Sequence, residues 1–153
     1  MFVFGKKSLS VIFKTVLQCI FIGGLTIFLS LPLCLKWYLE FSENYSEDYF
    51  LKTLILLYVS GVLALAVLYL SIRLLNNINK TTPFNIENPK ILKTIGVCSL
   101  LIAAIYFIAI FVIKSVFTII LFMIFVMLGF MAVILSEVFK KAIEYKEEND
   151  LTV

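Results

Sequence analysis

The segment RLLNNINKTTPFNIENPKILK, residues 73–93, decides the fold because it is a polar stretch in an otherwise apolar chain. Two long apolar runs precede this segment and two more follow it. The chain therefore has the order hairpin, connector, hairpin. We predict an all-α, single-domain integral membrane protein, a four-helix bundle made of two helical hairpins that this connector joins.

The composition indicates a membrane protein. The 153 residues are 62% apolar and 15% charged, and the mean hydropathy is +1.07. A soluble domain is about half apolar and about one quarter charged. A core of this size cannot bury so much apolar surface, so the remainder is expected to face lipid. The net charge of +3 is small and forms no basic face, which argues against direct nucleic acid binding.

Four apolar runs have the length needed to cross a bilayer, which is roughly 20 residues at about 1.5 Å per residue. We place the spans at about residues 11–35, 54–72, 95–113 and 116–135. Residues 96–135 contain only one charged residue, Lys114. One helix of this length would be about 60 Å long, twice the thickness of the hydrocarbon layer. Two spans joined by a tight turn at Lys114 and Ser115 are therefore predicted.

The first hairpin has a longer outer loop than the second. Pro32 lies near the end of the first span, where it can kink or end the helix. Residues 36–52 carry four acidic residues together with Trp37, Tyr38 and Phe41, which suggest an aromatic belt at the membrane interface. We interpret this segment as a solvated anchor loop and keep a binding role as the alternative.

Small residues four positions apart allow helices to approach closely. The second, third and fourth spans contain the pairs Ser60/Ala64, Ser99/Ala103 and Ala132/Ser136. Gly23 and Gly24 in the first span are interpreted in the same way, as a site of close packing or of a local bend.

Lysine and arginine residues lie mostly on one side of the predicted bundle. The side with both termini and the connector holds ten of them, which are Lys6, Lys7, Lys14, Arg73, Lys80, Lys90, Lys93, Lys140, Lys141 and Lys146. The other side holds Lys36, Lys52 and Lys114. Such an excess in short loops marks the cytoplasmic side. Both termini and the connector are therefore predicted to be cytoplasmic.

The connector, residues 73–94, contains a helix end and a helix start. The second span is expected to continue past the membrane as LLNNINK, and Pro83 then breaks the helix. Either Asn85 or Asn88 caps the next helix, and we favour Asn88 because it places Pro89 at the first helical position.

The tail, residues 136–153, has the sequence SEVFKKAIEYKEENDLTV. Its apolar residues alternate with charged residues at helical spacing, and Glu137 and Lys141 form a favourable pair one turn apart. We predict that the last span continues as a cytoplasmic amphipathic helix.

No set of residues forms a catalytic or metal-binding signature. The chain has no histidine, no paired carboxylates within the spans and no glycine-rich phosphate loop. Cys19, Cys34 and Cys98 lie in apolar runs and lack the spacing of a disulfide framework or a zinc site. We therefore expect no enzyme, no catalytic residue, no metal and no cofactor.

Polar groups inside membrane spans are costly and are the first functional candidates. Gln18 is the deepest of them, and we expect its amide to hydrogen-bond to a neighbouring helix. Too few other polar groups lie at this depth for an ion or proton pathway. At the ends of the second and fourth spans, Arg73 and Glu137 are predicted to pair across the bundle, with two independent interfacial charges as the alternative.

Two short motifs resemble a known family. The connector has a Pro-Phe-polar-x-Glu-Asn pattern, and the tail has a Glu-x-Phe element and an ending close to Glu-Asn-x-Leu-Thr-aliphatic. The matching residues are Pro83, Phe84, Asn85, Glu87, Asn88, Glu137, Phe139, Glu148, Asn149, Leu151, Thr152 and Val153. On these residues the chain resembles, over essentially its whole length, the uncharacterised bacterial membrane family called domain of unknown function 2975. Pro89 stands where an aliphatic residue is expected.

Members of this family look like small four-helix membrane proteins, and their genes often neighbour genes for Cro/repressor-type helix-turn-helix regulators. The resemblance implies a protein of the bacterial cytoplasmic membrane with such a regulator as its cytoplasmic partner. An amphipathic tail and the connector could bind it. The candidate partner-binding residues are Pro83, Phe84, Asn85, Glu87, Asn88, Phe139, Ile143, Tyr145, Asn149 and Leu151.

We favour a non-enzymatic sensor or scaffold whose partners are the lipid bilayer and this regulator, and a homo-oligomer stays open. The first alternative is a small immunity or envelope-stress protein whose outer loop, residues 36–52, meets a peptide or toxin. The second alternative is a transporter or channel component.

Overall fold

The computed structural model describes residues 6–80 and 84–152, which form five helices. They are α1 (Lys6–Leu29), α2 (Leu31–Phe41), α3 (Glu47–Lys80), α4 (Glu87–Ile113) and α5 (Val116–Leu151). The four long helices α1, α3, α4 and α5 are long and apolar enough to cross a membrane. The predicted all-α fold with four spanning helices is confirmed.

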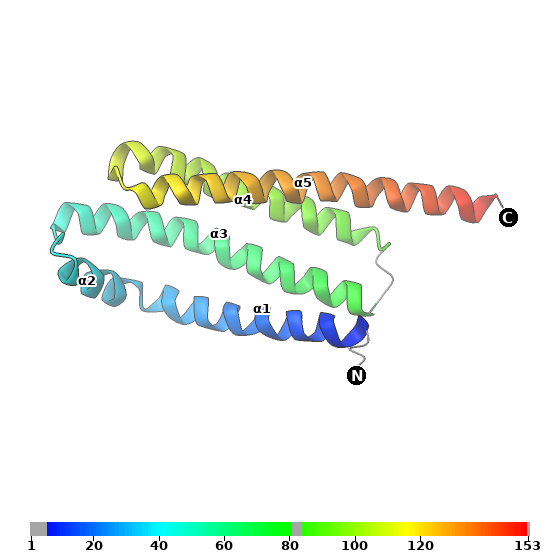
Figure 1. Cartoon of the computed structure of the whole chain (residues 1–153), viewed down its shortest axis with the longest axis horizontal. Helices are drawn as coiled ribbons and strands as arrows, with labels where there is room; N and C mark the ends of the chain where they lie inside the picture. Colours follow the sequence, from blue (N-terminus) through cyan, green and yellow to red (C-terminus); the bar gives the residue numbers. More distant parts are fainter. Residues whose placement is uncertain (1–5, 81–83, 153) are drawn as a thin grey trace, which may run out of the picture.

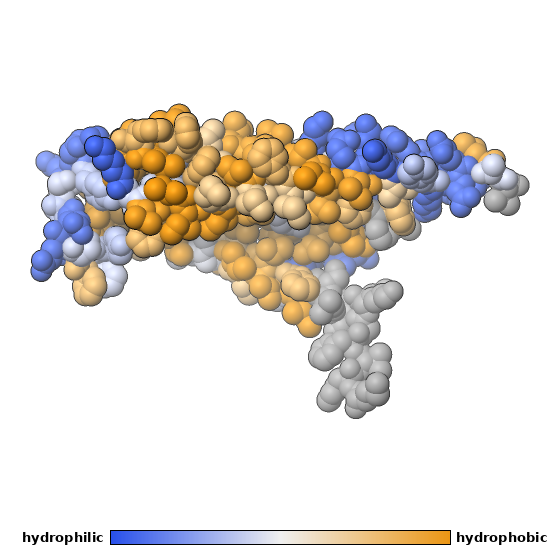
Figure 2. Space-filling view, turned by 45° about the horizontal axis from the view of Figure 1, so that its top comes forward, coloured by the Kyte–Doolittle hydropathy of each residue, from blue (hydrophilic) through white to orange (hydrophobic). Residues whose placement is uncertain are grey.

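The long helices run antiparallel to their neighbours in the chain (Figure 1). The start of α1, the end of α3, the start of α4 and the end of α5 share one end of the molecule, which we call the connector end. The α2–α3 and α4–α5 links share the other end, which we call the turn end. Figure 2 shows a hydrophobic band between hydrophilic ends, as expected of a protein that crosses a bilayer.

The first apolar run is broken, which corrects the single span expected over residues 11–35. Helix α1 ends at Leu29, and Pro32 lies at the start of α2, where its missing N–H costs no hydrogen bond. The Ser30 carbonyl accepts hydrogen bonds from the N–H groups of Leu33 and Cys34, both at 3.0 Å. The chain therefore bends at Ser30 and begins a second, short helix.

The segment expected as an outer loop, residues 36–52, is mostly helical. Helix α2 continues to Phe41 and α3 begins at Glu47, so only residues 42–46 lie between them. One side of α2 buries Leu31, Leu35 and Leu39, and α2 packs on α3. The aromatic rings of Trp37 and Phe41 stack on the exposed side. The expected aromatic belt therefore lies on helix α2. This segment forms a helix because its leucines recur every four residues and can be buried together on one side.

Helices α3 and α5 are much longer than the hydrocarbon layer is thick. With 34 and 36 residues, they extend about 51 Å and 54 Å, against a layer of about 30 Å. As predicted, α3 continues past Arg73, and it ends at Lys80. Helix α5 projects beyond the other helices at the connector end (Figure 1). Only residues 81–86 separate α3 from α4, and of these 81–83 lie outside the described residues.

The predicted tight turn between the third and fourth spans is confirmed. Helix α4 ends at Ile113 and α5 begins at Val116. Lys114 adopts the left-handed conformation, with φ 51° and ψ 39°, and Ser115 is extended. These two residues reverse the chain direction.

The tightest contact joins α4 to α5 at Gly96 and Gly129. A Cβ atom at Gly96 would lie 2.6 Å from Val133 Cγ2 and 3.0 Å from the Gly129 carbonyl oxygen. A Cβ atom at Gly129 would lie 2.6 Å from Leu100 Cγ. The predicted small residues Ser99, Ala103, Ala132 and Ser136 are all buried. Small side chains thus let these two helices approach closely.

The four long helices pack in series rather than around a common axis. Helix α1 packs on α3, α3 packs on α4, and α4 packs on α5. Between the described parts of α1 and α5, no two Cα atoms lie within 8 Å of each other. The bundle is therefore open along the side between its first and last helices.

Candidate functional site

The connector end contains a groove between the start of α4 and the tail of α5. Its volume is about 380 Å³. We call it the connector groove, and its lining residues are Ile86, Pro89, Lys90, Lys93, Ser136, Glu137, Lys140, Ile143, Glu144 and Glu147. Lysines of both helices and glutamates of α5 line it, over a floor that includes the buried residues Pro89 and Ile143.

The tail of α5 is fastened to the start of α4. The Ser136 hydroxyl donates a hydrogen bond of 2.6 Å to the Pro89 carbonyl oxygen, and both residues are buried. Farther out, the Lys146 ammonium lies 5.1 Å from the centroid of the Phe84 ring, a cation–π contact. The two polar segments that the sequence singles out therefore form one packed unit.

Glu87 joins the end of α3 to the start of α4. Its Oε2 atom lies 3.8 Å from Arg73 Nη2 and accepts a hydrogen bond of 3.3 Å from Asn77 Nδ2. This arrangement corrects the predicted pair of Arg73 with Glu137. In the part of the chain that the structure describes, Glu137 forms no ion pair. Glu87 lies closer to Arg73 than Glu137 does, because only a short link separates the end of α3 from the start of α4.

The helix cap differs from the favoured prediction. Helix α4 begins at Glu87, so Asn88 and Pro89 lie within its first turn. The Asn85 side-chain oxygen accepts a hydrogen bond of 3.0 Å from the Glu87 N–H, which fits the alternative that Asn85 organises the helix start. Asn88 is instead completely buried. Its burial makes it a structural residue.

The candidate partner-binding residues divide into buried and exposed groups. Besides Asn88, Ile143 is buried, so neither offers a surface to a partner. Asn85 and Phe139 are half-buried. The exposed candidates are Phe84, Glu87, Tyr145, Asn149 and Leu151, whereas Pro83 lies outside the described residues. Among the described residues of the tail, 136–152, Tyr145 and Leu151 are the most exposed apolar side chains, at 72% and 87%.

The prediction for Gln18 is wrong. Its side chain is exposed, and it forms no hydrogen bond to any described residue. Helix α1 contacts α3 through a stripe of half-buried residues, which includes Leu17, Phe21, Gly24 and Phe28. Gln18 lies beside this stripe, on the exposed surface of α1.

The sequence interpretation missed Tyr106 and the glycine pair Gly96 and Gly129. Tyr106 is buried in α4, and its hydroxyl lies 3.3 Å from Ser60 Oγ of α3, within hydrogen-bond distance. A tyrosine within an apolar span was a usable signal, because a buried hydroxyl needs a partner. The two glycines continue the patterns of small residues around Ser99 and Ala132.

The fold and the connector groove define a helical membrane protein with four spanning helices and one packed polar unit at the connector end. The described residues include no group of three side chains placed to hold a metal ion. The chain belongs to the family described as "Protein of unknown function (DUF2975)", which it matches over residues 34–153. The match begins within α2 and leaves out α1, so it is shorter than the whole-chain resemblance expected. No curated protein and no solved structure matches the chain.

Proposed function

We propose that the protein is a non-enzymatic, multi-pass sensor or scaffold that binds a cytoplasmic helix-turn-helix regulator at its connector end. The excess of lysine and arginine at this end supports a cytoplasmic location for it. The regulator is the partner class that the family resemblance implies.

One observation carries the proposal: the tail of α5 is held in place and yet leaves apolar side chains exposed. A tail that served only as a solvated extension would need neither the Ser136–Pro89 hydrogen bond nor the Lys146–Phe84 contact. Ile143 packs inward, and Tyr145 points to a different side of the same helix and remains exposed. A rigid helix that presents an aromatic side chain suits recognition by a groove on a partner protein.

The test measures binding between the purified full-length protein and the Cro/repressor-type helix-turn-helix regulator that the family resemblance leads us to expect beside its gene. The double variant Tyr145→Ala/Leu151→Ala should bind about tenfold more weakly, since exposed aromatic anchors contribute much of an interface's free energy. Tyr69→Ala is the matched control, because Tyr69 is also exposed but lies in the apolar part of α3. Equal binding by the double variant and the control would overturn the proposal.

A further inference from the structure

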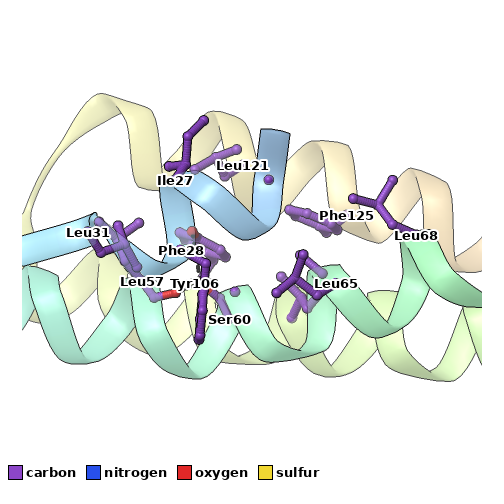
Figure 3. A pocket seen from close by; sticks show the side chains of 14 residues that line it. Ile27, Phe28, Leu31, Leu57, Ser60, Leu65, Leu68, Tyr106, Leu121 and Phe125 are labelled. Carbon is purple, nitrogen blue, oxygen red and sulfur yellow. Dashed lines mark hydrogen bonds between the residues drawn. The ribbon is translucent and has the colours of Figure 1, made fainter. Parts of the chain in front are cut away.

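Two neighbouring cavities extend from the turn end into the apolar band, and we call them together the crevice. The upper cavity, of about 840 Å³, lies among α2, α3, α4 and α5. The lower cavity, of about 290 Å³, lies deeper in the apolar band, with lining residues from all five helices (Figure 3). Leu57, Tyr106 and Leu121 line both cavities. The crevice lies where α1 and α5 leave the bundle open.

The two parts of the crevice differ in chemistry. The lower part is walled almost entirely by apolar side chains, among them Ile27, Phe28, Leu65, Leu68 and Phe125 (Figure 3). The upper part also contains hydroxyl and amide groups, which belong to Tyr38, Ser42, Asn44, Ser46, Tyr49, Thr53, Ser115 and Thr118. This order, polar at the surface and apolar at depth, is that of an amphiphile in a bilayer.

The upper part favours an anion. Lys114 is the one charged residue among its described lining residues, and it forms no ion pair with the described part of the chain. Helix α4 ends and α5 begins beside Lys114, so the opposite dipoles of the two helix ends offset each other and Lys114 supplies the net positive charge. Thr53 also lines this part, and its buried hydroxyl has no hydrogen-bond partner. A bound head group with acceptor oxygens would complement these groups.

The dimensions favour a single chain. The lining residues of α3 extend from Tyr49 to Leu68, 19 positions or roughly 28 Å along the helix. This length accommodates a head group and an extended acyl chain. The lower cavity, of about 290 Å³, is much smaller than the upper one, of about 840 Å³, so it suits a single narrow chain below a wider head group.

We infer that the crevice binds a single-chain amphiphile with an anionic head group, such as a long-chain carboxylate, which enters from the lipid between α1 and α5. The head group lies beside Lys114, and the chain passes Tyr106 into the lower cavity. The idea that this ligand is the signal of the proposed sensor rests on the function proposed above. The binding of the ligand does not depend on that function, because the crevice lies at the end opposite the connector groove.

The test uses the purified full-length protein in phosphatidylcholine nanodiscs, without any regulator. The probe is a photoactivatable sixteen-carbon fatty acid, compared with the corresponding fatty alcohol and with a photoactivatable phosphatidylcholine. We expect saturable labelling of residues that line the lower cavity by the fatty acid, with the alcohol binding about tenfold more weakly. Lys114→Gln should reduce fatty acid affinity by a similar factor, and the matched turn-end variant Lys36→Gln should not.

A second pair of variants tests the chain position. Leu65→Trp fills the lower cavity and should abolish labelling there, whereas Leu25→Trp, on the exposed side of α1, should not. Equal binding of acid and alcohol, or an unchanged affinity in Lys114→Gln, would overturn the anionic site. Saturable labelling by phosphatidylcholine at the same residues would show that an ordinary bilayer lipid fills the crevice, which also overturns the proposal. If the protein fails to bind the regulator, that result overturns only the proposed function and not the ligand site.

Discussion

At the scale of single residues, buried polar contacts outweigh the ion pairs. The side chains of Arg73 and Glu87 are 53% and 58% exposed, and an exposed pair of this kind contributes at most about 1 kcal/mol. The Ser136–Pro89 hydrogen bond lies out of contact with water, so water cannot compete for it. The attachment of the tail to α4 therefore depends more on the neutral hydrogen bond than on charge.

Gly96 is the residue whose substitution should damage the fold most clearly. Gly96→Ala places a methyl group against Val133 and against the backbone of Gly129, neither of which can withdraw without moving a helix. We expect a loss of about 1–3 kcal/mol, measured as a lower midpoint of thermal unfolding in detergent. Gly23→Ala is the control, because its methyl group would have nothing within 4 Å. A loss of stability in both variants would contradict the close contact of α4 with α5.

At the scale of elements, α1 is the least supported of the spanning helices. It packs on α3 and meets the short helix α2, but it does not reach α4 or α5 in the part of the chain that the structure describes. The Phe28 ring meets the Tyr58 ring edge-on at 5.1 Å and lies over Gly61. The side of Gly61 next to this ring leaves no space for a Cβ atom. This contact holds α1 at one wall of the crevice.

Phe28→Ala should loosen α1 while leaving the α4–α5 pair intact. Aromatic pairs of this geometry contribute about 1 kcal/mol beyond their buried area. We therefore expect a comparable loss of stability and easier proteolysis near the start of α1, with α4 and α5 still protected. Phe13→Ala serves as the control, since Phe13 is exposed on the same helix. Equal effects of the two substitutions would show that Phe28 does not anchor α1.

At the scale of the whole molecule, the charge distribution predicts how the protein lies in the membrane. The ten cationic residues at the connector end should keep that end in the cytoplasm. In a variant without Cys19, Cys34 and Cys98, a cysteine at Glu43 should react in intact cells with a membrane-impermeant maleimide. A cysteine at Glu148 should react only after the cells are opened. The reverse pattern would invert the orientation and remove the support for a cytoplasmic partner.

The sequence by itself determined the four spanning helices, their antiparallel order and the turn at Lys114. These features depend on the length and spacing of apolar runs, which the thickness of a bilayer limits directly. The sequence marked Pro32 as a place where the helix can kink or end, because proline acts through its own backbone, but it did not predict the separate helix α2.

Only the tertiary structure decided the contacts between helices. In the structure, Arg73 pairs with Glu87 rather than with Glu137. Gln18 is exposed, whereas Asn88 and Ile143 are buried. The crevice lies between α1 and α5, whose described residues make no close contact. Each of these outcomes depends on the rotation and distance of helices that are far apart in the chain. In a bilayer every outward face of these helices can be apolar, so hydrophobic pattern alone does not show which face meets protein and which meets lipid.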